Sequence, residues 1–236
     1  GIQAQLTPLY GEFDLNFLAE TPGGEGYILK VMRADCDVAF IDMQIKALEY
    51  IAANAPDLPF PAIIPTRAGQ SVFHHKDAAG DVRLIWLLER LPGHLFTAAQ
   101  PKSTELLTDD GETAGASDLR RPEFDRPELD RPLHWNQKQA GWVTDHLSDL
   151  TTPTRRAVLD QIIVDFDVVK PALGQLPTQA IHNDISDHKI LVTGHLSEPP
   201  AISGLIDLGD MCRAPRICNL AIAAAYLLLG ADNPEQ

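Results

Sequence analysis

The sequence is poor in cysteine, aromatic residues and positive charge, and it has no long apolar run. Its three cysteines are an odd number without CxxC spacing, which is typical of a reducing compartment and excludes a disulfide framework or a zinc ribbon. No stretch of roughly 18 apolar residues occurs, so no membrane span is expected. The first residues also lack the basic and then apolar layout of a secretory signal. We therefore expect a cytoplasmic protein without a membrane partner.

Positive charge is the scarcest of these features. The 236 residues include 19 Lys and Arg against 33 Asp and Glu, for a formal net charge of −14. Proteins that bind nucleic acid neutralise phosphates with clustered Lys and Arg, and no such cluster occurs here. Nucleic acid is therefore not an expected partner. A chain of this length buries about 70–75% of its unfolded surface, so it needs no metal or disulfide to hold a core.

The first ninety residues have the pattern of β-strands around one helix. Strands are expected over four segments: 15–20, 27–32, 70–74 and 83–90. The Gly-rich turn 21–26 between the first two is a hairpin signal, and no GxxxxGK[ST] sequence occurs that would make it a P-loop. Apolar residues recur at helical spacing over 38–54, and Pro56 ends the pattern.

After Pro92 and Gly93 the pattern becomes mostly helical. Helices are expected at 105–114, 138–148, 154–172 and 220–229, and short buried strands at 190–193 and 201–206. The acidic, mixed-charge stretch 109–131 is interpreted as solvated surface. The sequence thus predicts an α+β protein of two lobes, a β-rich N-lobe over 1–91 and a mostly helical C-lobe over 92–236 that carries one hairpin.

Polar side chains concentrate at the two ends of this hairpin. The triplet His182-Asn183-Asp184 precedes its first strand, and Asp207 follows its second strand. Because the two ends of a hairpin lie about 5 Å apart, Asp207 should return beside the loop 182–189. One carboxylate can then accept a proton from a hydroxyl while the other holds a divalent cation. That division of roles is typical of phosphoryl transfer.

Other interpretations of these residues stay open. Buried or capping aspartates with a purely structural role are the plain alternative for Asp184 and Asp207. His182 and His188 suggest a metal-dependent hydrolase, although their spacing fits no HExxH-type site. The aromatic segment 134–142 is either core or the wall of a pocket that attracts an amine.

The order of these motifs is similar to that of a known enzyme family. The pattern HxD at 182–184, followed by IDxGD at 206–210, resembles the catalytic loop and metal-binding turn of the aminoglycoside phosphotransferase and choline kinase family. The segment 204–226 also resembles the kinase-like domain fused ahead of class III aminotransferases. The resemblance covers residues 9–230. It implies a two-lobed protein-kinase-like fold, with ATP and Mg²⁺ as cofactors.

The resemblance implies a role for each matching residue. Asp184 corresponds to the catalytic base, His182 to a scaffold residue that braces the loop, and Asp207 to the aspartate that bridges Mg²⁺ to the nucleotide phosphates. Lys30 corresponds to the strand lysine that contacts the α and β phosphates. Asp14 and Asn16 correspond to the nucleotide-loop signature, and Gln44 to the helix residue that pairs with the strand lysine. Glu89 and Leu91 correspond to the hinge, whose backbone groups bind adenine.

Two matching positions depart from the family pattern. Lys189 stands where the family has the asparagine that binds a second metal, and an ammonium group has no lone pair to ligate a cation. Gln44 stands where a glutamate usually pairs with Lys30. Either one metal suffices, or Asp187 or Asp210 compensates, or Lys189 supplies the charge itself, or catalysis is crippled.

These features predict an ATP-dependent phosphotransferase that transfers the γ-phosphate to a hydroxyl of a small amine-bearing molecule. Hydroxy amino acids, ethanolamine-like compounds and aminoglycoside-like compounds are the candidate acceptors. The alternative is a catalytically impaired kinase-like domain that binds nucleotide or substrate as a regulatory or docking module. Family members usually continue for many helical residues after the metal-binding turn, so we expect this chain to be part of a longer polypeptide. The second resemblance makes a following aminotransferase domain a candidate partner.

Overall fold

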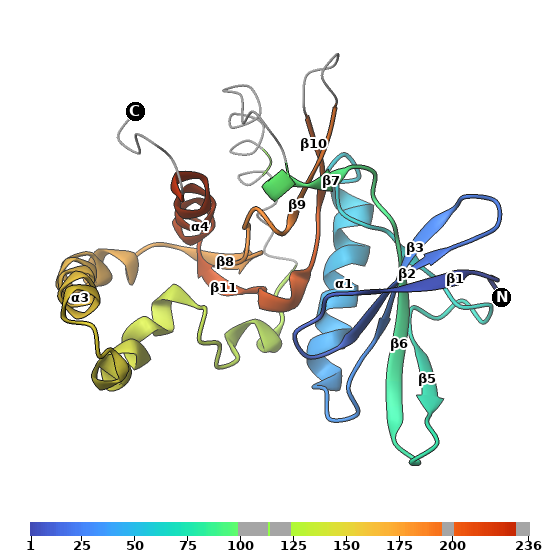
Figure 1. Cartoon of the computed structure of the whole chain (residues 1–236), viewed down its shortest axis with the longest axis horizontal. Helices are drawn as coiled ribbons and strands as arrows, with labels where there is room; N and C mark the ends of the chain where they lie inside the picture. Colours follow the sequence, from blue (N-terminus) through green and yellow to red (C-terminus); the bar gives the residue numbers. More distant parts are fainter. Residues whose placement is uncertain (99–112, 114–123, 195–200, 230–236) are drawn as a thin grey trace. The chain divides into compact units, whose positions relative to one another are not determined.

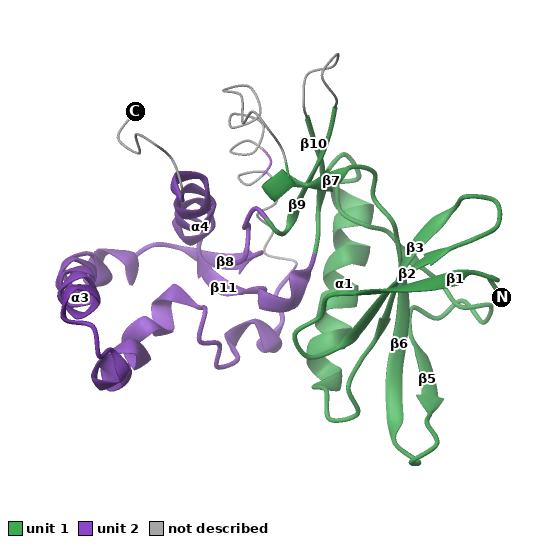
Figure 2. Cartoon of the chain, in the orientation of Figure 1, with its two compact units in different colours: residues 1–106, 188–206 green, residues 107–187, 207–236 purple. Residues whose placement is uncertain are grey.

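The computed structural model describes residues 1–98, 113, 124–194 and 201–229 (Figure 1). The chain divides into two compact units (Figure 2), the first with residues 1–106 and 188–206, the second with residues 107–187 and 207–236. The division predicted from the sequence, into two lobes with a boundary after residue 91, differs from these two compact units and stays a prediction. Apart from Thr113, the helix expected at 105–114 lies outside the described residues.

The first unit contains a six-stranded antiparallel sheet with the order β1-β2-β3-β6-β4, and β5 also pairs with β6. Its strands are Gln5–Leu9 (β1), Leu15–Glu20 (β2), Gly26–Val31 (β3), Ile63–Ile64 (β4), Phe73–Lys76 (β5) and Val82–Glu89 (β6). The four predicted strands are present within three residues of their expected bounds. β1 and β4 were not predicted, because β1 is exposed and contains Pro8, and β4 is only two residues long.

Helix α1, Val38–Asn54, has the predicted bounds and runs beside this sheet (Figure 1). The Asp37 side chain caps it by accepting hydrogen bonds from the N–H groups of Ala39 and Phe40. Asp is a preferred N-cap residue because it satisfies backbone donors that have no partner within the helix. Its apolar residues with helical spacing, such as Ile41 and Leu48, are buried and form the core of this unit together with the inner face of β6.

The predicted hairpin is confirmed, and it belongs to the first unit. Its strands are Ile190–Thr193 (β9) and Ala201–Leu205 (β10). With His94–Leu95 (β7) they form a three-stranded sheet of the order β10-β9-β7. A short 3₁₀ turn, Phe96–Ala98 (η1), follows β7. Ile190 lies opposite Leu205. The Ile206 N–H donates to the Lys189 carbonyl at 2.9 Å. Asp207 therefore follows directly after the last hydrogen bond of the hairpin, as predicted.

Gly93 directly precedes β7 and lies close to the β9–β10 hairpin. Its φ is +106°, and a Cβ there would collide with the Val192 carbonyl oxygen and lie 2.6 Å from Ser203 Oγ. We expect Gly93→Ala to lower the free energy of unfolding by about 2 kcal/mol or more, because a left-handed non-glycine residue alone costs roughly 1–3 kcal/mol and the collision adds to it. Urea denaturation measures this loss.

Gly69→Ala is the matched control for this substitution. Gly69 has a φ of +76°, but no atom lies within 4 Å of the position that its Cβ would take. It therefore reports the backbone cost without the collision. Equal losses of unfolding free energy in the two variants would contradict the close approach of Gly93 to the hairpin.

The second unit is built around a two-stranded antiparallel ladder of Thr178–Ile181 (β8) and Cys212–Pro215 (β11). Its helices and 3₁₀ turns are Pro127–Asp130 (η2), Gln137–Asp149 (η3), Pro153–Leu173 (α3), Leu208–Asp210 (η4) and Ile217–Leu228 (α4). Fully buried residues of β8, β11 and α4 form its core cluster: Ile181, Cys212, Ala214 and Cys218. The ladder was not predicted, because two strands of four residues carry too short a pattern.

Two expectations for this unit need correction. The segment 137–149 is a 3₁₀ helix rather than an α-helix. The stretch 109–131 is only partly solvated at its C-terminal end: Asp125 and Asp130 are exposed, but Phe124 and Leu129 are buried. The remainder of this stretch lies outside the described residues apart from Thr113. Helices α3 and α4 lie within three residues of their expected bounds.

Helix α3 buries none of its side chains among the described residues. Its apolar residues that are more than half exposed are Val158, Ile162, Val164, Val168 and Val169.

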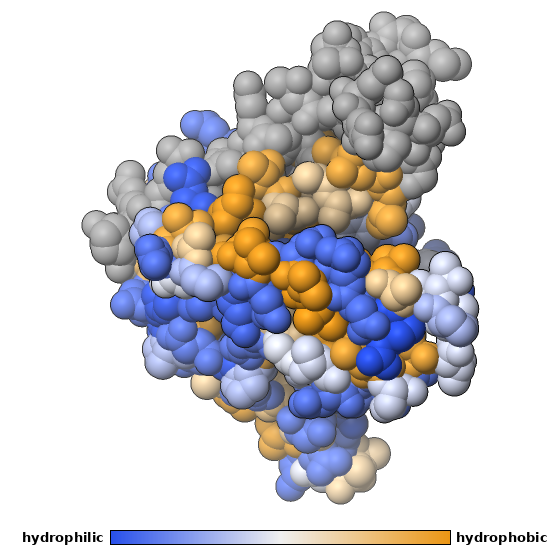
Figure 3. Space-filling view, turned by 90° about the vertical axis from the view of Figure 1, so that its left-hand side faces the viewer, coloured by the Kyte–Doolittle hydropathy of each residue, from blue (hydrophilic) through white to orange (hydrophobic). Residues whose placement is uncertain are grey.

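Figure 3 shows hydrophobic areas between hydrophilic ones on the side of the molecule that it presents. Within the described part of the chain, no helix is both long and apolar enough to cross a membrane.

Candidate functional site

Two loops leave the same end of the β8–β11 ladder. Ile181 ends β8 and lies opposite Cys212, which begins β11. Asp184 follows Ile181 by three residues, and Asp207 precedes Cys212 by five residues. Because neighbouring strands lie about 5 Å apart, the second unit brings the two predicted carboxylates to one end of a single ladder. We call residues 182–187 the Asp184 loop and the segment from Asp207 to Met211 the Asp207 turn.

Each of these segments contains a backbone conformation that is unusual for a residue other than glycine. Asn183 has a φ of 64° and Asp207 a φ of 70°, and these are the two non-glycine residues with positive φ in the described part of the chain. Asn and Asp adopt this region more readily than other side chains. Such conformations persist where neighbouring structure holds them, which is frequent at functional sites.

The Asp184 loop is held by hydrogen bonds to three different groups. His182 and Asn183 are each only 2% exposed. The Asp184 N–H donates to His182 Nδ1 at 3.2 Å, so the neutral ring carries its proton on the other nitrogen. The Asn183 N–H donates to Asn219 Oδ1 on α4 at 2.8 Å, and Asn183 Nδ2 donates to the Trp135 carbonyl at 3.3 Å. These hydrogen bonds fix the backbone that carries the half-buried Asp184. A fixed backbone is what the scaffold role predicted for His182 requires.

The Asp207 turn is held from within and from a distant segment. Asp207 Oδ1 accepts a hydrogen bond from the Gly209 N–H at 3.3 Å. The Arg131 guanidinium donates to the Gly209 carbonyl at 2.8 Å and to the Met211 carbonyl at 2.6 Å. Sequence reasoning missed Arg131 and Asn219, because hydrogen bonds between residues so far apart in the chain leave no local pattern.

In the first unit, Lys30 and Asn16 lie side by side on one face of the large sheet. Asn16 pairs with Lys30 across β2 and β3, and Lys30 pairs with Trp86 across β3 and β6. Lys30 Nζ lies 5.4 Å from the centroid of the Trp86 ring. Asn16 Oδ1 is buried and has no hydrogen-bond partner among the described residues. A buried acceptor without a partner is rare in proteins, and it suits a donor group of a ligand.

The other predicted nucleotide-binding residues lie at different places in the same unit. Asp14 Oδ1 accepts a hydrogen bond from the Arg33 N–H at 2.8 Å and so connects the turn before β2 to the segment that follows β3. Gln44 is 4% exposed on the inner face of α1. Glu89 is the last residue of β6, and Leu91 lies two residues after it. Their role in binding a nucleotide stays a prediction.

Glu49 does not replace the glutamate that the family places near the strand lysine. Ser71 Oγ donates to Glu49 Oε1 at 2.6 Å, and Lys46 Nζ donates to Oε2 at 2.7 Å. These hydrogen bonds lower the pKa of Glu49. The carboxylate is therefore engaged elsewhere, and the uncharged Gln44 stands at the position of the expected partner of Lys30.

The carboxylates of the Asp207 turn fit a magnesium ion better than a transition metal. Among the residues that the structure describes, no group of three or more His, Cys, Asp or Glu side chains is arranged to hold a metal, so the hydrolase interpretation of His182 and His188 gains no support. Mg²⁺ is usually bound through one or two carboxylates together with phosphate oxygens and water. Asp207 and Asp210 offer such oxygens, whereas Lys189 offers none.

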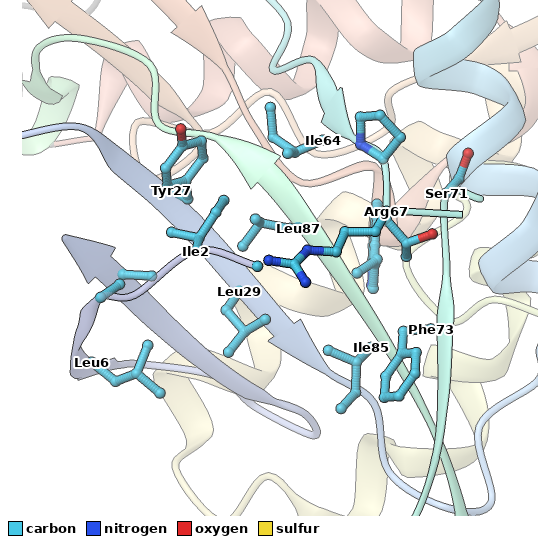
Figure 4. Close-up of a pocket in the computed structure, with 16 residues that line it drawn as sticks. Ile2, Leu6, Tyr27, Leu29, Ile64, Arg67, Ser71, Phe73, Ile85 and Leu87 are labelled. Atoms are coloured by element: carbon cyan, nitrogen blue, oxygen red, sulfur yellow. The ribbon is translucent and has the colours of Figure 1, made fainter. Parts of the chain in front are cut away.

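An apolar pocket of about 620 Å³ lies on the other face of the large sheet (Figure 4). Leu29 and Leu87 line it. Each lies next to Lys30 or Trp86 in the sequence, and successive side chains of a strand point to opposite faces of the sheet. Arg67 lies across it among Ile2 and other apolar side chains. Its lining includes no carboxylate and none of the predicted site residues, so it is not the candidate site.

Cys212 in the ladder and Cys218 on α4 are not candidate nucleophiles. Burial raises the pKa of Cys212 to about 12, and it also raises the pKa of Cys218. A thiol is reactive as the thiolate, which is scarce at neutral pH when the pKa is high. These cysteines therefore serve as small apolar residues of the core.

Comparison with known proteins identifies the family. Residues 6–235 match the family described as the phosphotransferase enzyme family, which is nearly the whole chain. The chain belongs to this family. The two loops at the end of the β8–β11 ladder are therefore those of a phosphotransferase-family protein, and the predicted resemblance to that family is confirmed. The finer resemblance, to the kinase-like domain fused to class III aminotransferases, stays a prediction.

Proteins with known names are similar to this chain over almost its full length. It is 28% identical to the hydroxylysine kinase of Danio rerio over 247 residues and 25% identical to that of Mus musculus over 256 residues. Each alignment covers 99% of this chain but only 68% and 67% of these two proteins. The chain therefore spans about two thirds of their length. A fused aminotransferase domain stays a prediction.

Solved structures establish the fold. An amicoumacin kinase aligns with a TM-score of 0.66 at 17% identity, covering 95% of this chain and 64% of the other. A microcompartment-associated aminopropanol kinase aligns with a TM-score of 0.63 at 20% identity, covering 96% and 70%. A type VIII aminoglycoside-3'-phosphotransferase aligns with a TM-score of 0.61 at 18% identity, covering 97% and 80%. The predicted kinase-like α+β fold is confirmed.

Proposed function

We propose that this phosphotransferase-family chain transfers the γ-phosphoryl group of ATP, with Mg²⁺, to a hydroxyl group of a small amine-bearing molecule. The observation that supports this most strongly is the placement of Asp184 and Asp207 on two fixed loops at one end of the β8–β11 ladder. Hydroxy amino acids are the preferred acceptor class, because the curated relatives that align over the whole chain are named hydroxylysine kinases.

In this reaction Asp184 accepts the proton of the acceptor hydroxyl. The acceptor oxygen forms a bond to the γ-phosphorus, the bond from that phosphorus to the bridging oxygen breaks, and ADP leaves with the electron pair. The transition state of phosphoryl transfer is loose, so positioning and charge stabilisation contribute most of the catalysis. The hydrogen bonds of His182 and Asn183 supply that positioning, because they fix the backbone that carries Asp184.

Asp207 would hold Mg²⁺ through a carboxylate oxygen. When bound, the ion neutralises charge on the phosphates. Lys30 would contact the α and β phosphates as a second positive charge, and the unpartnered Oδ1 of Asn16 beside it would accept a hydrogen bond from the nucleotide. The solved amicoumacin kinase contains AMP-PNP and Ca²⁺, which supports a nucleotide and a divalent cation as cofactors in this fold.

The two departures from the family pattern, Lys189 and Gln44, favour a second candidate function. It is a kinase-like module that binds nucleotide or acceptor without efficient transfer. Lys189 cannot ligate the second metal. Gln44 can hydrogen-bond Lys30 but cannot neutralise it. If Lys189 instead supplies positive charge to the phosphates, transfer remains efficient with one metal.

A coupled assay of ADP release distinguishes the two functions. The chain is incubated with ATP, Mg²⁺ and one acceptor at a time: hydroxylysine, serine, ethanolamine or kanamycin. We expect acceptor-dependent ADP release that is fastest with a hydroxy amino acid, and a lower rate in Lys189→Asn because the positive charge is lost. No release by the unmodified chain, together with a large gain in Lys189→Asn, would instead identify the impaired module.

A further inference from the structure

The short segment 131–135 contacts both loops of the candidate site. Arg131 donates to the Gly209 and Met211 carbonyls of the Asp207 turn at 2.8 and 2.6 Å. At the other end of the segment, the Trp135 carbonyl accepts a hydrogen bond from Asn183 Nδ2 of the Asp184 loop at 3.3 Å. All of these residues belong to the second unit. One stretch of five residues thus connects the two loops that carry the candidate carboxylates.

The Arg131 side chain is suited to this contact by its shape. A guanidinium presents N–H donors in a planar fork, and here two of its nitrogens bind two carbonyls that are two residues apart. Hydrogen bonds from a charged donor are roughly twice as strong as those between neutral groups. A lysine keeps the charge, but its single nitrogen does not reproduce the fork.

The turn that Arg131 holds needs support from outside. Asp207 has a φ of 70°, which is unfavourable for a non-glycine residue and persists only where the surrounding structure holds it. Within the turn, Asp207 Oδ1 accepts a hydrogen bond from the Gly209 N–H at 3.3 Å. Arg131 binds the carbonyls of Gly209 and Met211, so it restricts the backbone that sets the direction of the Asp207 carboxylate.

Arg131 is itself attached to fixed neighbours. Gln139 Nε2 donates to the Arg131 carbonyl at 3.3 Å, and Gln139 Oε1 accepts from the Leu133 N–H at 3.0 Å. Asn136 is 2% exposed and caps η3 through the Lys138 N–H at 3.0 Å. The guanidinium therefore extends from an anchored segment.

We propose that Arg131 is a positioning residue for the metal-binding carboxylate of Asp207. This role rests on the proposed function, in which Asp207 holds the divalent cation. Arg131 acts through the Gly209 and Met211 carbonyls. Its loss allows the turn to leave the strained conformation, so the cation binds more weakly while Asp184 and its loop keep their hydrogen bonds to His182 and Asn219.

Binding of Mn²⁺ in the presence of AMP-PNP tests this role without relying on turnover. Electron paramagnetic resonance of free Mn²⁺ gives the dissociation constant. Groups that orient a metal ligand typically change metal affinity about 10–100-fold when removed, so we expect Arg131→Met to weaken Mn²⁺ binding by that factor. Arg131→Lys should fall between Arg131→Met and the unmodified chain, and it serves as the second variant if Arg131→Met does not fold.

Arg156→Met is the matched control. Arg156 lies on α3 in the second unit, and its guanidinium also binds a backbone carbonyl, that of Leu147 at 2.8 Å, together with the Asp160 carboxylate at 2.9 and 3.1 Å, but not the Asp207 turn. We expect its Mn²⁺ affinity to stay within about twofold of the unmodified chain, as for most substitutions away from a site. Circular dichroism on heating shows that each variant is folded at the assay temperature.

The possible results separate the two proposals. Unchanged Mn²⁺ affinity in folded Arg131→Met and Arg131→Lys would overturn the role of Arg131 and leave that of Asp207 intact. Equal weakening in Arg131→Met and Arg156→Met would also overturn it, because the effect would then be a general loss of structure. If the unmodified chain binds no Mn²⁺ with AMP-PNP, the metal role of Asp207 is wrong, and the role of Arg131 is wrong with it.

Discussion

Asp184→Asn should lower kcat by about 10²–10⁴-fold, the range that general base catalysis contributes. An amide has the size of the carboxyl group but cannot accept the proton of the acceptor hydroxyl. The hydrogen bond from the Asp184 N–H to His182 Nδ1 uses the backbone, so the loop should keep its shape. Initial rates measure the effect, and calorimetric titration with AMP-PNP should show nucleotide affinity close to that of the unmodified chain.

Asp167→Asn is the matched control for the loss of one carboxylate. Asp167 is exposed on α3 and makes no hydrogen bond or ion pair among the described residues. Its substitution should leave kcat unchanged. A similar rate in Asp184→Asn and Asp167→Asn would show that Asp184 is one of the structural aspartates considered above and not the base.

Asp207→Asn should lower the rate by about 10²-fold or more. A metal ion supplies several kcal/mol of charge stabilisation, and about 1.4 kcal/mol corresponds to a factor of ten. Asn tolerates the left-handed backbone and keeps an acceptor for the Gly209 N–H, so the turn should fold. Rates measured against Mg²⁺ concentration should show a much higher requirement for the ion.

Asp210→Asn is the informative comparison in the same turn. If Asp210 compensates for Lys189 as a second metal ligand, its substitution also raises the Mg²⁺ requirement; if one metal suffices, the requirement stays the same. Either result defines the number of carboxylates that the ion uses. An unchanged rate and Mg²⁺ requirement in Asp207→Asn would contradict the assignment of Asp207.

The elements that the sequence predicted well have a repeating pattern of their own. Helix α1 has Asp37 as a cap and apolar residues at helical spacing, and its bounds agree with the prediction at both ends. The β9–β10 hairpin was predicted from two short apolar runs joined by a turn, and its register brings Ile206 opposite Lys189. This hairpin is the pattern from which the return of Asp207 toward the Asp184 loop was predicted.

The features that were missed depend on contacts between distant segments. The β8–β11 ladder pairs residues such as Ile181 and Cys212, and each strand is too short for a pattern. Arg131 belongs to a charged stretch that was interpreted as solvated surface, yet its guanidinium binds carbonyls 78 and 80 residues further along the chain. Charge alone does not distinguish a solvated arginine from one that satisfies buried carbonyl groups.

Mass spectrometry of the acceptor decides most directly whether these loops carry out phosphoryl transfer. The chain is incubated with ATP, Mg²⁺ and hydroxylysine, and both ADP and phosphorylated hydroxylysine are quantified. We predict one phosphorylated acceptor for each ADP formed, and neither product above background in Asp184→Asn. ADP formation without phosphorylated acceptor, or equal product in Asp184→Asn, would contradict the proposed function.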